Sequence, residues 1–213
     1  PISDSNNFSY PIIHLLKLKI MENNYKNLDK YEKLAEIQDL RLIRKERPYA
    51  AKYLKALWLN NSEVIAEYES FVNSARQLLM NRREYDQHLL FGFTDIAFNE
   101  YGWLERPLFL DVEHFEFPHR DGWAVMNHIT IGRGINGKWS YGASYSCNTS
   151  GGGYGLGVWG KIFDNRKTCL ISALQELMDK LKKVDQDKYT VRVLKQAKEL
   201  FDTVTGRKVV QLE

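Results

Sequence analysis

One block of the chain, residues 137–181, constrains the fold more than any other part of the sequence. It follows Asn136-Gly137, a pair typical of a type I′ hairpin turn, in which both central residues need a positive φ. Aromatic side chains then alternate with small ones over residues 139–145, as in a strand with two different faces. A glycine run predicts a flexible loop formed by Gly151, Gly152 and Gly153. A further strand is expected over 154–163, before a helical stripe of leucines, namely Leu170, Leu174, Leu177 and Leu181.

Two more strands are expected before this block, over residues 107–117 and 123–133, which are rich in β-branched and aromatic residues. Four consecutive strands on short turns predict an antiparallel meander. The leucine stripe has to be buried, and the neighbouring aromatic face with Trp139 and Tyr141 is apolar. We therefore expect the helix over 166–181 to pack on that face of the sheet.

The first half of the chain has helical periodicity instead. Asp29 and Glu32 have the spacing of a capping box at the start of a helix, and Pro48 is expected to stop that helix near Arg47. Further helices are expected over the ranges 49–59, 63–80, 84–99 and, near the C-terminus, 189–204. The fold class expected is therefore α+β. An N-terminal helical region, residues 1–103, precedes a four-stranded antiparallel meander with packed C-terminal helices, residues 104–213.

Charge is distributed unevenly along the chain. The whole protein has a formal net charge of only +3, yet residues 120–213 hold 15 Lys and Arg against 9 Asp and Glu. A basic segment of this kind favours contact with phosphate groups. The cations expected to make that contact lie before and at the start of the predicted helix over 166–181, and they are Lys138, Lys161, Arg166 and Lys167.

No enzyme signature is complete. Residues 155–161 match the spacing G-x-x-x-x-G-K of a phosphate-binding loop, but Ile162 replaces the Ser or Thr that would hold Mg²⁺. Acidic and histidine side chains are concentrated between residues 111 and 128, and they are Asp111, Glu113, His114, Glu116, His119, Asp121 and His128. A hairpin centred after His119 would set Asp111 opposite His128. Because these groups converge poorly, we expect no catalytic residue, no metal and no cofactor.

Two cysteines, Cys147 and Cys169, are too few for a disulfide scaffold, so we expect free thiols and a cytoplasmic protein. The apolar run over residues 10–20 is short and is interrupted by Lys17 and Lys19, so no membrane-spanning segment is expected.

Two resemblances add to this interpretation. The order of a helical region, three strands and a helix resembles the double-stranded-RNA-binding domain, in which the start of that helix is rich in lysine. Arg166-Lys167-Thr168 stands at the corresponding position, and the match continues through Ala173-Leu174 to Leu177. The run Lys138-Trp139-Ser140-Tyr141-Gly142, the glycines at 151–153, and Phe163 followed by the helix are similar to a short module of uncharacterised phage and mobile-element proteins. This second resemblance implies a role in the replication or modification of mobile DNA.

The function expected is therefore non-enzymatic binding within a phage or mobile-element system, with contact to nucleic acid through the basic C-terminal half. The first alternative is a protein–protein interaction or inhibitor module that uses the helical region and exposed aromatic side chains. The second alternative is a metal-dependent enzyme that uses the strand residues 111–128.

Overall fold

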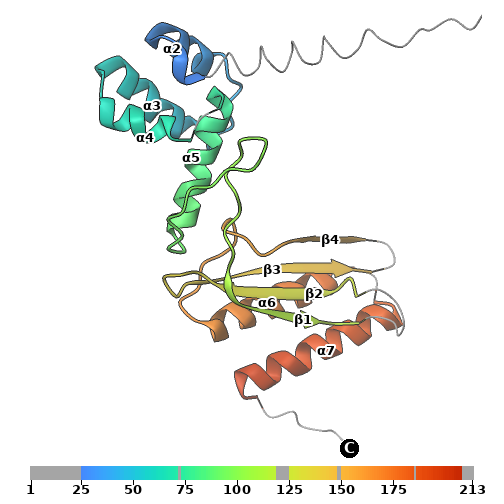
Figure 1. Ribbon diagram of the computed structural model, residues 1–213. Coiled ribbons are helices and arrows are strands. Elements are labelled where there is room, and N and C mark those ends of the chain that lie inside the picture. The colour runs from blue at the N-terminus through green and yellow to red at the C-terminus, as the bar shows by residue number, and fades with distance from the viewer. Residues whose placement is uncertain (1–24, 72, 119–124, 148–149, 185, 208–213) are drawn as a thin grey trace, which may run out of the picture. The chain divides into compact units, whose positions relative to one another are not determined.

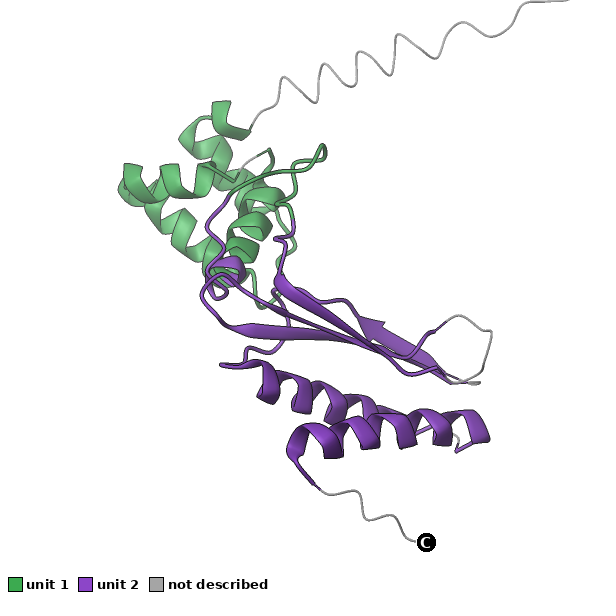
Figure 2. Ribbon diagram, turned by 60° about the horizontal axis from the view of Figure 1, so that its bottom comes forward, with its two compact units in different colours: residues 1–86, 96–105 green, residues 87–95, 106–213 purple. Residues whose placement is uncertain are grey.

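The computed structural model describes residues 25–71, 73–118, 125–147, 150–184 and 186–207 (Figure 1). The chain divides into two compact units (Figure 2). Unit 1 comprises residues 1–86 and 96–105, and unit 2 comprises residues 87–95 and 106–213. Helices form unit 1, while unit 2 contains an antiparallel sheet and the C-terminal helices, which confirms the α+β fold class.

The helical elements of the first half are the 3-10 turn η1 (Tyr25–Asn27) and the helices α2 (Lys30–Gln38), α3 (Arg47–Leu59), α4 (Ser62–Glu69) and α5 (Ala75–Leu89). The expected capping box is present, because Asp29 accepts hydrogen bonds from the backbone of Tyr31 and Glu32, and Glu32 accepts one from Asp29. The core of this unit is rich in tyrosine, with the rings of Tyr53 and Tyr68 stacked at 5.3 Å.

The expected helix bounds in this unit are wrong in two places. Helix α2 ends at Gln38, and Pro48 lies in the first turn of α3 instead of ending the preceding helix. A proline fits there because the first turn of a helix has no partner for its N–H group. The helix expected over 63–80 is broken, because α4 ends at Glu69 and α5 begins at Ala75, where the Ser74 hydroxyl accepts a hydrogen bond from the Gln77 backbone. Helix α5 then continues through the break expected before residue 84 and ends at Leu89, so residues 90–99 are not helical.

The sheet of unit 2 has the strand order β1-β2-β3-β4, with every neighbouring pair antiparallel. The strands are β1 (Leu110–Glu116), β2 (His128–Arg133), β3 (Trp139–Ser146) and β4 (Gly151–Tyr154). Helices α6 (Arg166–Leu181) and α7 (Lys188–Thr205) lie on the same side of the sheet (Figure 2). Asn165 caps the start of α6 and Gly206, with a φ of 76°, ends α7.

The leucine stripe of α6 packs on the aromatic face of the sheet, as expected. Trp139 and Tyr141 from β3 lie in one buried cluster with the stripe residues Leu170, Leu174, Leu177 and Leu181. Val193 and Ala197 of α7 join the same cluster, so both helices contribute to one core. Trp139 and Tyr141 of β3 are therefore core residues.

The glycine run is not the loop that we expected. Gly151, Gly152 and Gly153, with Tyr154, form strand β4, which pairs with β3. Glycine allows the two backbones to come close here, because a Cβ on Gly153 would lie 2.7 Å from the Ser144 Cα. Residues 155–163 are consequently not the fourth strand; they form a loop that returns to β3, where Phe163 bridges to Trp139.

The hairpin between β2 and β3 lies where Asn136-Gly137 predicted it, but the type I′ turn is wrong. Gly137 has a φ of 84°, whereas Asn136 is not among the residues with positive φ. Asn136 is held by the 90–91 backbone, to which its amide side chain and its own N–H donate hydrogen bonds of 3.0 and 3.2 Å. This tertiary contact selects the turn geometry.

Candidate nucleic-acid interface

Three of the four cations expected to contact phosphate are already paired with carboxylates. Lys138 bonds to Asp164 at 2.6 Å, and Arg166 forms a two-pronged pair with Glu113 on β1. Lys161 lies 3.6 Å from Glu176. Lys167 is exposed and has no hydrogen-bond or ion-pair partner within the described part of the chain. The structure thus distributes these four residues among different partners and does not gather them into one cluster.

These pairs affect the ionisation of the acidic partners. The guanidinium of Arg166 lowers the pKa of Glu113, and the ammonium of Lys138 lowers the pKa of Asp164. Both pairs are exposed to solvent, where such bonds stabilise a protein only weakly. A phosphate could therefore replace the carboxylate in either ion pair with little loss of stability.

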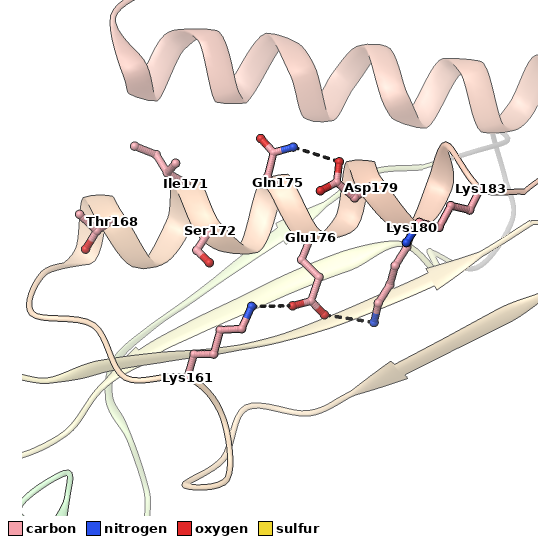
Figure 3. A pocket seen from close by; sticks show the side chains of 9 residues that line it. All are labelled: Lys161, Thr168, Ile171, Ser172, Gln175, Glu176, Asp179, Lys180 and Lys183. Carbon is pink, nitrogen blue, oxygen red and sulfur yellow. Dashed lines mark hydrogen bonds and ion pairs between the residues drawn. The ribbon is translucent and has the colours of Figure 1, made fainter.

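A first hollow, of about 500 Å³, runs along one flank of α6 (Figure 3). Three of its lining residues are lysines, the loop residue Lys161 and the α6 and post-α6 residues Lys180 and Lys183. The remaining lining residues come from the exposed side of α6, and they are Thr168, Ile171, Ser172, Gln175, Glu176 and Asp179.

Glu176 is the central carboxylate of the first hollow. It accepts hydrogen bonds from the phenols of Tyr141 at 2.7 Å and Tyr154 at 3.0 Å, and it lies 3.1 Å from the Lys180 ammonium. Burial alone would raise the pKa of Glu176, but the bonds from Tyr141, Lys180 and Tyr154 outweigh burial and lower this pKa to about 2. Glu176 is thus a permanent anion that ties α6 to β3 and β4, and it is unsuited to act as a general base near neutral pH.

A second hollow, of about 460 Å³, lies between α6 and α7. Its apolar lining consists of Met178, Val191, Leu194 and Phe201, and its cations are Lys182, Lys195, Lys198 and Arg207. Gln175 and Asp202 complete the lining. Within the described residues neither Lys195 nor Lys198 has a hydrogen-bond or ion-pair partner, and both are exposed. The Arg207 guanidinium lies 5.7 Å from the centre of the Phe201 ring.

Sequence reasoning missed the cations of the second hollow. A signal was present, because Val191, Leu194, Lys195 and Lys198 recur at the three- and four-residue spacing that places side chains on one face of a helix. Only the packing of α7 beside α6 shows that this face lines a hollow instead of pointing into open solvent.

The acidic and histidine residues of β1 and β2 pair in a different register from the one that we expected. Glu116 is opposite His128, and His114 is opposite Thr130, so the register that set Asp111 opposite His128 is wrong. The reason is that β1 ends at Glu116 and β2 begins at His128, so the connection between them is longer than the expected register assumed. The His114 Nδ1 atom is 3.0 Å from the Thr130 hydroxyl. Among the described residues no three His, Cys, Asp or Glu side chains could hold a metal ion, and His119 and Asp121 lie outside them.

The chain matches no protein-family model, no curated protein and no solved structure. Neither Cys147 nor Cys169 forms a disulfide, and no helix in the described part of the chain is long and apolar enough to cross a membrane.

Proposed function

We propose that this protein binds nucleic acid, without catalysis, through the basic surface formed by α6, α7 and Lys161. We further propose that it does so in the cytoplasm, within a phage or mobile-element system. The resemblance of residues 138–181 to the mobile-element module supports the proposed context. The cations of unit 2 support the proposed interface.

One observation carries the proposal. The two hollows that flank α6 are lined by seven Lys and Arg, namely Lys161, Lys180, Lys182, Lys183, Lys195, Lys198 and Arg207, against three carboxylates, those of Glu176, Asp179 and Asp202. Three of the cations are paired with these carboxylates, Lys161 and Lys180 with Glu176 and Lys182 with Asp179. The other four, Lys183, Lys195, Lys198 and Arg207, have no ion-pair partner among the described residues. The surface therefore presents more positive charge than the net charge of +3 would indicate.

The spacing of the cations suits a regular chain of phosphates. Lys195 and Lys198 are three residues apart on α7, so their Cβ atoms are about 5–6 Å apart. Phosphates recur along a nucleic-acid strand at a comparable interval, about 3.4 Å of axial rise plus the winding of the strand. Contacts of this kind give affinity without reading the sequence of bases.

The test is fluorescence anisotropy with labelled DNA and RNA oligonucleotides over a series of salt concentrations. A double Lys195→Ala, Lys198→Ala variant should weaken binding to all sequences alike. It should also reduce the slope of log K against log salt by about 1.5, since each lost phosphate contact contributes about 0.7–0.9. The matched control is Arg44→Ala, Lys45→Ala, which removes the same charge from exposed positions of unit 1 and should leave the slope unchanged.

Two results would contradict the proposal. One is the absence of binding even at low salt by a sample that unfolds cooperatively. The other is an equal loss of affinity in the control variant, which would show that net charge alone determines the retention of nucleic acid.

A further inference from the structure

The second hollow has an apolar floor, formed where α6 and α7 lie side by side (Figure 2). Leu194 and Phe201 of α7 are partly buried and pack against the core of unit 2, and Met178 of α6 is buried in that core. Val191, near the start of α7, lines the same hollow and is 49% exposed. The floor is therefore an extension of the core that reaches the protein surface.

Cations border this floor on both helices. Lys182 directly follows α6, whereas Lys195 and Lys198 lie four and seven positions after Val191 on α7, on the same face of the helix. Within the described chain neither Lys195 nor Lys198 has a hydrogen-bond or ion-pair partner. Asp202 is the one carboxylate in the described lining. An occupant of the hollow is therefore expected to carry negative charge.

Phosphates match the cations of this hollow but not its floor. A phosphate is strongly hydrated and gains nothing from an aliphatic side chain, so it contacts the ammonium groups and leaves Val191 exposed. Apolar surface that is bordered by polar side chains marks a contact site for another apolar group. The floor thus favours an occupant with an apolar face of its own beside its negative charges.

The groove suits a helix better than an extended segment. Its apolar floor runs along α7 from Val191 to Phe201, which corresponds to about 15 Å or about three helical turns. The backbone groups of α6 and α7 bond within each helix, so an extended segment would find no backbone partners over this floor. A helix satisfies its own backbone groups and presents only side chains to the groove.

We infer that the second hollow is a docking groove for an acidic amphipathic helix of a partner protein. The apolar face of that helix covers Val191, Leu194 and Phe201, and its carboxylates pair with Lys195 and Lys198. This docking goes beyond the proposed function and does not depend on it. Because the two lysines also belong to the proposed nucleic-acid surface, the helix and a nucleic acid compete for them.

The experiment uses the full chain and three labelled peptides of about 14 residues, which is about four helical turns. The first peptide has Leu at the i, i+3, i+4 and i+7 spacing of one helical face, Glu beside that face and Ala elsewhere. The second has Lys in place of every Glu, and the third is a scrambled form of the first without an apolar face. Fluorescence anisotropy should show saturable binding of the Leu/Glu peptide, binding about tenfold weaker for the scrambled peptide, and no binding of the Leu/Lys peptide.

Two variants test the two parts of the groove. Val191→Ala shortens an apolar side chain of the floor and should weaken binding of the Leu/Glu peptide by about 3- to 10-fold. It should leave the affinity for an oligonucleotide unchanged, because phosphates contact the lysines. The double Lys195→Ala, Lys198→Ala variant should weaken binding of both ligands, and an excess of the Leu/Glu peptide should displace a bound oligonucleotide.

The matched control is Ile135→Ala. Ile135 is also a β-branched side chain of unit 2, is 58% exposed and lies outside the lining of the hollow. Its replacement should change the affinity for neither ligand. Urea denaturation checks that Val191→Ala and Ile135→Ala are folded, which is expected because both side chains are about half-exposed or more.

The outcomes separate this inference from the proposed function. Binding of the Leu/Glu peptide without binding of an oligonucleotide at low salt would overturn the proposed function alone. Equal affinity for the Leu/Glu and scrambled peptides, or an unchanged peptide affinity in Val191→Ala, would overturn the docking groove and leave nucleic-acid binding intact.

Two results would overturn the inference in favour of another occupant. If the Leu/Glu peptide binds only to a chain shortened to end at Arg207, residues 208–213 occupy the hollow instead of a partner. If the peptide does not bind and sedimentation detects dimers that Val191→Ala dissociates, the occupant is a second copy of this chain.

Discussion

Glu176 shows how one residue connects the helix layer, the sheet and the proposed interface. Its carboxylate accepts from phenols on β3 and β4, and its position in the first hollow keeps Lys161 and Lys180 close together. The pKa of about 2 means that Glu176 is anionic at every pH at which the protein would work. Its negative charge therefore positions the lysines, and under the proposed function the cations without an ion-pair partner would attract the phosphates.

Neutralising Glu176 should reduce stability in a manner that depends on pH. An unfolded Glu has a pKa of about 4.3, above the folded value, so the ionised carboxylate stabilises the fold at higher pH and this contribution is lost as the pH falls. We expect Glu176→Gln to lower the free energy of unfolding by on the order of 2–3 kcal/mol above about pH 5, with the difference from the original protein vanishing toward pH 2.

Urea denaturation at a series of pH values from 2 to 7, about one unit apart, would measure this effect. Asp179→Asn is the control on the same helix. Its carboxylate is half-exposed, accepts a hydrogen bond from Gln175 and lies 3.8 Å from the Lys182 ammonium, and such surface contacts contribute about 0–1 kcal/mol. A difference between original protein and Glu176→Gln that is independent of pH would contradict the prediction.

At the scale of elements, the loop over 155–163 depends on glycines in the sheet beneath it. A Cβ on Gly142 of β3 would lie 2.3 Å from the Leu156 backbone nitrogen. Backbone atoms cannot move aside as the end of a flexible side chain can, so the loop would have to lift from the sheet. Sequence patterning placed Gly142 on the face of β3 opposite Tyr141, but it did not show what lies against that face.

Gly142→Ala should therefore destabilise the protein by about 1–3 kcal/mol. Gly157→Ala, in the loop itself, is the matched control, because nothing lies within 4 Å of its added Cβ. We expect that control to be neutral or stabilising by up to about 1 kcal/mol, through a less flexible unfolded chain. Chemical denaturation followed by tryptophan fluorescence measures both, and equal stability of the two variants would show that the loop does not press on the sheet.

The packing of α6 on the sheet gives a second prediction at this scale. Leu174 is 0% exposed in the cluster that contains Trp139 and Tyr141, so Leu174→Ala should cost about 2–5 kcal/mol. Val191→Ala removes an apolar side chain that is 49% exposed on α7 and should change stability by less than about 0.5 kcal/mol. A loss below about 0.5 kcal/mol for Leu174→Ala would contradict the observed packing.

At the scale of the whole molecule, the proposed binding depends more on where the charged residues lie than on the net charge. Residues 120–213 hold 15 of the 30 Lys and Arg but only 9 of the 27 Asp and Glu. Helices α6 and α7 carry part of this excess around the two hollows, one beside the 155–163 loop and the other between the two helices. Binding in this protein is therefore expected to depend on unit 2.

Several features of the fold were determined by the sequence alone, because they depend on neighbours along the chain. The alternation in 139–145, the leucine spacing in 170–181 and the capping box at Asp29 are local patterns, and each predicted the element that it belongs to. The antiparallel meander followed from short connections. The packing of α6 on the aromatic face followed because two adjacent apolar surfaces can bury each other.

Tertiary structure alone decided the features that depend on approach between distant residues. Whether Gly151–Gly153 form a loop or a strand is determined by the backbone of β3, not by the glycines themselves. The turn at Asn136 is determined by the 90–91 backbone, and the pairing of Arg166 with Glu113 joins residues 53 positions apart. The basic hollows arise only when α7 and the 155–163 loop come to lie beside α6. The spacing of apolar residues along the chain indicates which side of an element is apolar. A surface shared by several elements forms only when those elements pack together.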